Sequence, residues 1–112
     1  MPSSPTVPAD CPVDLDHLKR MTLGEEKLER EVLELFLAQT SRLLDAQTSD
    51  AGAMAHTLKG SARAIGAFRV GDSAALLEAA IRQGGDPSPA LTALKATVAE
   101  ARAAIEARLG RT

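Results

Sequence analysis

Apolar residues recur along this chain at the spacing of amphipathic α-helices. Between residue 25 and about residue 47 they fall at positions i, i+4, i+7 and i+8, which places them on one face of a helix. We expect that face to be buried; it consists of Leu28, Val32, Leu35 and Phe36. Further apolar residues widen it and predict contact with more than one neighbour: Leu33, Leu37, Leu43 and Leu44.

Three more helices are predicted downstream. The first begins after Ser49 or Asp50, either of which can act as N-cap, and it ends near Gly66, which suits the C′ position. The second spans about residues 69–83, and the last follows the Gly-Gly-Asp-Pro sequence at residues 84–87. The residues expected to point inward from these last two helices are Val70, Ala74, Leu77, Ile81, Leu91, Leu94, Val98, Ala101, Ile105 and Leu109.

A shorter helix over residues 13–21 precedes these four. Thr22 and Glu25 have the spacing of a capping box, which predicts Thr22 as N-cap of the first long helix. Long amphipathic helices joined by short loops pack as antiparallel neighbours. We therefore predict an all-α fold, an up-down-up-down four-helix bundle with a short additional N-terminal helix and no strand. Residues 1–12 are expected to form a flexible Pro-rich tail and residues 13–112 a single domain.

The composition excludes several classes of function. The 112 residues carry a formal net charge of −2 and include two phenylalanines but no tryptophan or tyrosine, so neither charge nor stacking favours nucleic acid. Cys11 is the single cysteine, which rules out an internal disulfide. No apolar run approaches the about 20 residues that cross a bilayer, and residues 1–12 do not have the pattern of a secretory signal. We expect a cytoplasmic protein with no membrane partner.

The helix that carries His56 has two contrasting faces. At about 100° per residue, one stripe is apolar, whereas His56, Lys59 and Arg63 lie almost opposite it and face water. Gly52 and Gly60 lie on the outer side as well, one turn before and one turn after the histidine. A glycine inside an exposed helix costs about 1 kcal/mol relative to alanine. We infer that something needs close access to the backbone beside this imidazole. The expected apolar stripe is Met54, Leu58, Ala62 and Ile65.

The residues of this face are compatible with phosphoryl transfer, provided that a partner supplies the rest of the chemistry. A neutral imidazole is a competent nucleophile, an exposed histidine is mostly neutral near pH 7, and the neighbouring cations further favour the neutral ring. Lys59 and Arg63 would also suit a phosphoryl group, whose charge is spread over its oxygens. The chain has neither a G-x-x-x-x-G-K-[ST] loop nor a G-x-G-x-x-G motif, which disfavours ATP binding. We expect no bound metal, since His56 has glycines at i±4 and Lys59 at i+3. His17 is expected to be a solvated surface histidine.

Residues 56–66 read H-T-L-K-G-S-A-R-A-I-G, which resembles the signature of histidine phosphotransfer (HPt) domains of multistep two-component phosphorelays. The signature is close to His-x-Leu-Lys-Gly-[Ser/Ala]-[Ala/Ser]-x-x-x-Gly, and the match has no interruption. Residues 33–37 and 76–78 resemble the preceding and following helices of that family, so the similarity covers most of the chain from Val13 onward.

The resemblance implies that His56 accepts a phosphoryl group at Nε2 from the aspartyl phosphate of a response-regulator receiver domain and passes it to a second receiver's aspartate. It also implies that Lys59 helps to hold the phosphoryl oxygens and that Gly60 clears space for the partner. Mg²⁺ is expected on the receiver and no cofactor on this chain. Arg63 and Arg82 lie where partner or phosphoryl contacts could occur. Receivers and a hybrid histidine kinase are the expected partners of a monomeric phosphocarrier that lacks catalytic machinery of its own.

Two alternatives stay open at this stage. A histidine-kinase dimerisation module also displays a histidine on a helical bundle, but its usual motif has an acidic residue after the histidine and a proline five residues on. Here those positions hold Thr57 and Ser61. A helical adaptor that binds receiver domains without ever carrying phosphate is the second alternative.

Overall fold

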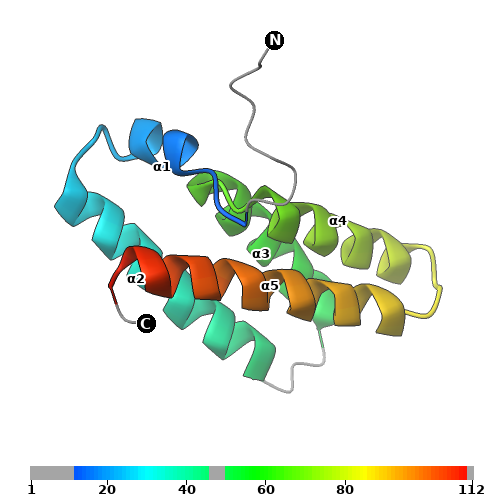
Figure 1. Ribbon diagram of the computed structural model, residues 1–112. Coiled ribbons are helices and arrows are strands. Elements are labelled where there is room, and N and C mark those ends of the chain that lie inside the picture. The colour runs from blue at the N-terminus through cyan, green and yellow to red at the C-terminus, as the bar shows by residue number, and fades with distance from the viewer. Residues whose placement is uncertain (1–11, 46–49, 111–112) are drawn as a thin grey trace, which may run out of the picture.

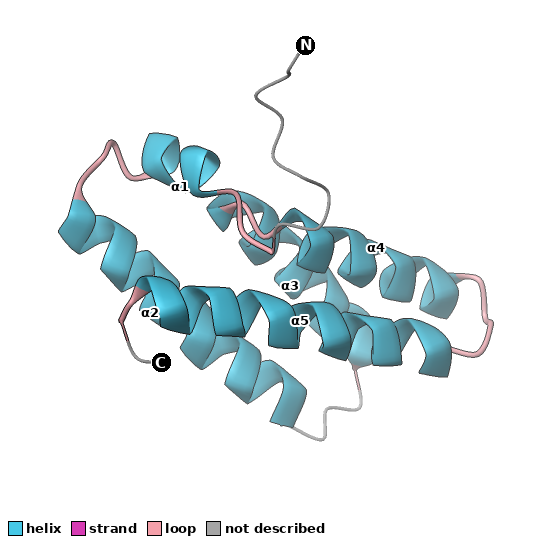
Figure 2. Ribbon diagram, viewed as in Figure 1, coloured by secondary structure: helices cyan, strands magenta, loops and turns pink. Residues whose placement is uncertain are grey.

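The computed structural model describes residues 12–45 and 50–110 and folds them into five helices (Figure 1). The described part of the chain contains no strand (Figure 2), as the periodicity predicts. The all-helical fold class is thus confirmed. The helices are α1 (Leu15–Met21), α2 (Glu26–Asp45), α3 (Ala51–Ile65), α4 (Phe68–Arg82) and α5 (Ser88–Arg108).

The four long helices pack around one apolar core, and α1 lies at the end of the molecule where α3 turns into α4 (Figure 1). The most extensive contacts join α3 to α4 and α4 to α5. The predicted inward faces of α4 and α5 are confirmed for the residues at their centres, while Ile81 and Leu91 are only partly buried. The buried residues of these two helices include Val70, Ala74, Leu77, Leu94, Val98, Ala101 and Ile105.

The predicted buried face of α2 is wrong in part. Leu35 is 70% exposed and Leu28 is exposed as well, whereas Leu33 and Leu37 are buried beside Phe36. Because α2 has leucines on several sides, the apolar spacing fits two orientations of the helix, and packing against α3 and α5 selects one. The selected face includes the buried Thr40, whose hydroxyl donates to the carbonyl oxygen of Phe36 at 3.0 Å.

Arg102 of α5 explains how a polar threonine fits into this face. Its guanidinium donates to Thr40 Oγ1 and to the carbonyl oxygen of Leu37, both at 2.6 Å. Each buried oxygen of this stretch therefore has a hydrogen-bond partner, which removes most of the cost of its burial. This contact ties α5 to α2.

The predicted capping box at Thr22 is also wrong. Thr22 is the C-cap of α1, and its hydroxyl donates to the carbonyl oxygen of Leu18 at 2.8 Å. Leu23 and Gly24 then take left-handed conformations with φ of 56° and 76°, and α2 begins at Glu26. The left-handed turn at Leu23 and Gly24 separates Thr22 from the start of α2, so Thr22 caps the end of α1 and not the start of α2.

His17 is not the solvated residue that the sequence predicted. Its ring is half-buried, its Nε2 lies 3.1 Å from the carbonyl oxygen of Ala64, and its edge meets the ring of Phe68 with centroids 5.1 Å apart. A second contact joins the same two elements, since the amide of Asp14 donates to the carbonyl oxygen of Gly66 at 2.9 Å. Both contacts attach α1 to the end of α3.

Several expectations fall at residues outside the described ranges. The expected tail lies there except for Pro12, as do Gln47 and Ser49. Of the two candidate caps, Asp50 is described and is the N-cap of α3, where its carboxylate accepts from the amide of Ala53 at 2.9 Å. Within the described ranges, no helix is both long enough and apolar enough to cross a membrane.

We expect Leu58→Ala to lower the free energy of unfolding by about 2–5 kcal/mol, because Leu58 of α3 is fully buried and its truncation leaves a cavity. Leu35→Ala removes the same atoms from an exposed position and should change stability by less than about 0.5 kcal/mol. Urea unfolding followed by circular dichroism measures both. Equal losses for the two variants would contradict the orientation of α2 and α3.

Candidate functional site

The helix that carries His56 is fixed at both ends. Asp50 caps its start, and Gly66 ends it in a left-handed conformation with φ of 92°, as the sequence predicted. A side chain at Gly66 would also meet Asp14, because a Cβ there would lie 2.8 Å from the carbonyl oxygen of Asp14. The helix between these caps buries Met54, Ala55, Leu58, Ala62 and Ile65, so its opposite face is held outward.

His56 stands on that outward face with 70% of its side chain exposed. Its Nδ1 lies 2.9 Å from Oε2 of Glu78, a residue of α4 that is 22 positions away in sequence. The contact is possible because α4 packs alongside α3 (Figure 1). The histidine is therefore exposed to solvent on one side and held by a carboxylate on the other.

Lys59 is bound to the same carboxylate. Its Nζ donates to Oε1 of Glu78 at 2.7 Å, one turn further along α3 than His56. The Glu78 side chain is only 16% exposed, and the hydrogen bond from Lys59, followed by the one with His56, lowers the pKa of its carboxyl below the usual value. Glu78 is therefore ionised at neutral pH, with one oxygen for each partner.

An ionised carboxylate can only accept hydrogen bonds, so the proton between Glu78 and His56 belongs to Nδ1. In a neutral imidazole with the proton on Nδ1, the lone pair lies on Nε2. Glu78 thus fixes both the orientation of the ring and the nitrogen that can act as nucleophile. The sequence predicted that Lys59 and Arg63 would act on the ring as neighbouring charges; the structure adds Glu78, whose carboxylate accepts from both the ring and Lys59.

Gly60 is exposed, and a Cβ placed there would have no atom within 4 Å apart from its immediate chain surroundings. Nothing inside the described structure therefore requires a glycine at this position. At Gly52, by contrast, a Cβ would make ordinary contacts with Asp50 and Ile81 at 3.6 and 3.8 Å. Of the two glycines that flank His56 on α3, only Gly60 therefore has open space beside it.

Of the four residues singled out in the sequence, the structure brings His56 and Lys59 together and places Gly60 beside them. Arg63 instead turns towards the start of α4, where its guanidinium lies 3.8 Å from Asp72. Arg82, the last residue of α4, is exposed.

Glu78 is the site residue that sequence reasoning missed. No spacing within one helix marks it, because its partners belong to the neighbouring helix. Asp72 and Glu78 are the two acidic residues of α4. The available signal was that Glu78 directly follows Leu77, a residue predicted to be buried, which places its carboxylate near the surface that packs against a neighbouring helix.

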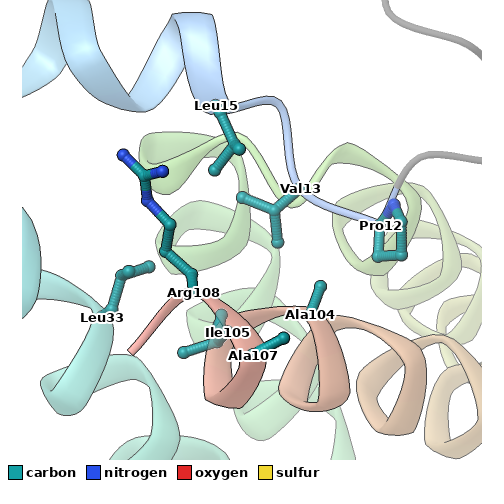
Figure 3. Close-up of a pocket in the computed structure, with 8 residues that line it drawn as sticks. All are labelled: Pro12, Val13, Leu15, Leu33, Ala104, Ile105, Ala107 and Arg108. Carbon is teal, nitrogen blue, oxygen red and sulfur yellow. The ribbon is translucent and has the colours of Figure 1, made fainter. Parts of the chain in front are cut away.

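A second concave region lies away from this site. It is a cavity of about 380 Å³ formed by the segment before α1 together with α1, α2 and α5. Figure 3 shows the side chains that line it, most of them apolar, such as Val13, Leu33 and Ile105. Its one cation, Arg108, is paired with Glu29 at 2.7 Å. None of the residues around His56 lines it. Among the described residues, no group of three His, Cys, Asp or Glu could hold a metal ion.

Comparison with known proteins agrees with this geometry. The family model described as Hpt domain matches residues 26–104, which include α2, α3, α4 and most of α5. No curated protein and no solved structure matches the chain significantly. The match covers well over half of the sequence, and the histidine of the signature is the exposed His56. The chain belongs to the Hpt domain family, whose members carry out histidine phosphotransfer in phosphorelays.

Proposed function

We propose that this protein is a phosphocarrier whose His56 accepts a phosphoryl group on Nε2 from the aspartyl phosphate of a receiver domain and gives it to the aspartate of a second receiver. The observation that supports the proposal most strongly is the hydrogen bond between Nδ1 of His56 and the Glu78 carboxylate on an exposed ring, because in the neutral imidazole it leaves the lone pair on Nε2.

The transfer step follows from that tautomer. The Nε2 lone pair attacks the phosphorus, a nitrogen–phosphorus bond forms, and the phosphorus–oxygen bond to the aspartate breaks to release a carboxylate. Nε2 has no proton to lose, so the attack needs no general base. The ring gains positive charge as it reacts, and the Glu78 carboxylate at Nδ1 stabilises that charge, in the way that a carboxylate supports a catalytic imidazolium.

Lys59 and Gly60 complete the site. Lys59 is held beside the ring by Glu78, where its ammonium can neutralise charge on the phosphoryl oxygens. Gly60 leaves room for the receiver to bring its phosphorylated aspartate up to the ring. The Mg²⁺ that assists the reaction would be bound by the receiver, and this chain would supply the nucleophile on a rigid helix.

The proposal also includes the finer features expected of such a carrier. We propose that the four long helices follow one another in up-down-up-down order. We further propose that the protein is a cytoplasmic monomer and that a hybrid histidine kinase is the source of the phosphoryl group. A kinase-like dimerisation module would instead be a dimer, which size-exclusion chromatography with light scattering detects. A phosphate-free adaptor would bind a receiver without becoming labelled.

We expect His56→Gln to abolish labelling while the protein stays folded, because the exposed ring contributes little to the core. The measurement is transfer of ³²P from a receiver phosphorylated with acetyl phosphate, together with the acid lability of the product.

His17→Gln is the matched control, since the chain has two histidines and His17 bonds through Nε2 to a backbone carbonyl. This variant should be labelled as well as the wild type. Label retained on His56→Gln and lost from His17→Gln would overturn the assignment.

Glu78→Ala should slow labelling of His56 by roughly tenfold. This factor corresponds to the free energy of about 1.4 kcal/mol that a hydrogen bond between a carboxylate and an exposed ring contributes. It should also release the ring from one tautomer, which ¹⁵N NMR of the imidazole detects: the wild type at pH 8 should show the proton on Nδ1, the variant a mixture. A wild-type ring with its proton on Nε2 would contradict the proposed role of Glu78.

Lys59→Ala should slow transfer by roughly tenfold, less than the loss of a buried oxyanion donor because this site is open to water. Stability and the tautomer of His56 should stay as in the wild type, since the Glu78 contact with the ring remains. Lys95→Ala, on the exposed surface of α5, is the control for charge. Equal rates for the two variants would count against Lys59.

A further inference from the structure

Arg63 and Gly71 form a contact that the phosphotransfer step does not use. A Cβ built on Gly71, the fourth residue of α4, would lie 2.8 Å from Cγ of Arg63 and 3.2 and 3.5 Å from its Nε and Cδ. Gly71 is buried, so the space that its missing side chain leaves is filled by the stem of this arginine. The arginine crosses from α3 onto α4 at that position.

A glycine within a helix costs up to about 1 kcal/mol relative to alanine, so the glycine in this first turn of α4 needs a reason. Close approach of two helix backbones would be the ordinary reason. Here the three nearest atoms all belong to the Arg63 side chain and none to the backbone of α3. The contact begins at Cγ, close to the backbone of Arg63, so that rotation of the outer side chain alone cannot relieve the clash with an alanine. Gly71 is therefore matched to the stem of Arg63.

The direction of this stem decides what the guanidinium can reach. Arg63 is two turns beyond His56 on α3, about 10 Å along the axis. It leans towards Gly71 and Asp72, whereas His56 leans towards Glu78, further along α4. The Arg63 side chain thus points away from His56, and a partner domain that covers His56 and the open Gly60 would reach the guanidinium only if it extended about two turns further along α3.

The guanidinium is held in place but only weakly paired. Arg63 and Asp72 are 49% and 77% exposed, and their ion pair at 3.8 Å is long. Exposed pairs of this kind contribute little, so an acidic group of a partner can replace Asp72 at low cost. The stem of Arg63 is thus held against Gly71, which leaves its guanidinium available on the outward face of α3, two turns from His56.

We propose that Gly71 seats the stem of Arg63 so that its guanidinium forms a docking contact with acidic side chains on the phosphate-bearing face of the receiver. That face must be acidic, because it carries the aspartyl phosphate and the carboxylates that bind Mg²⁺. The inference rests on the proposed function and adds to it a residue that determines affinity for the partner. Arg63 is a docking residue, and Gly71 positions it.

The test uses the full chain and a receiver domain that labels the wild-type protein. Arg63→Met removes the charge and keeps most of the stem; it should raise KM for the phosphorylated receiver roughly two- to fivefold, leave kcat unchanged, and weaken the dependence of KM on salt. Gly71→Ala should displace the stem and give a similar change. Arg69→Ala, in an ion pair with Glu100 of α5, is the charge-matched control and should behave as the wild type.

The double variant makes the test specific. Arg63→Ala vacates the space above Gly71, so adding Gly71→Ala to it should change KM no further, whereas two independent effects would add. An Arg63→Met KM equal to that of the wild type, a loss confined to kcat, or additive effects in the double variant would each overturn the inference. If Gly71→Ala did not fold, the Arg63→Met kinetics would still decide the docking role. Failure of the wild type to accept phosphate from any receiver would instead refute the proposed function.

Discussion

The Glu78 carboxylate accepts hydrogen bonds from two side chains of the neighbouring helix, and the chemistry of the site depends on that arrangement. One oxygen fixes the tautomer of His56 and the other holds the ammonium of Lys59 beside the ring. Neither contact exists unless α3 and α4 keep their relative position along and around their axes. The buried residues of the two helices, among them Leu58 and Leu77, therefore position His56 as directly as the polar residues do.

The packing of α4 against α3 also explains why two cations on the outer face of α3, Lys59 and Arg63, point in different directions. Lys59 and Arg63 both leave the outer side of α3, but α4 offers a carboxylate to the first and a gap over a glycine to the second. Lys59 is thereby held near the imidazole, where the proposed transfer would place a phosphoryl group. Arg63 is directed away from it, where a receiver's own acidic surface would arrive. In the proposed function, phosphoryl transfer and docking of the receiver thus depend on different residues, Lys59 and Arg63, which are one turn apart on α3.

The end of α3 opposite its N-cap is held by contacts that look incidental in the sequence. Gly66 stops the helix and leaves space for Asp14, and the ring of His17 packs between Ala64 and Phe68. α1 is in this way attached to the turn between α3 and α4, the two helices that form the site. The two histidines of the chain thus have different surroundings, since His17 bonds to a backbone carbonyl within the fold and His56 faces solvent with Nδ1 against a carboxylate.

Much of the protein was determined by the sequence alone. The helical periodicity predicted the number of helices, the inward faces of α4 and α5, the end of α3 at Gly66 and the exposure of His56, because each follows from residues close together in the chain. The eleven-residue motif identified the family for the same reason. Only the tertiary structure decided which of the two leucine rows of α2 is buried and that Thr22 caps α1. It also decided that His17 contacts the end of α3 and that Glu78 and Gly71 of α4 contact side chains of α3. These features depend on contacts between separate helices, whose mutual rotation and offset are set by the packing of side chains distant in sequence, and no local spacing records that.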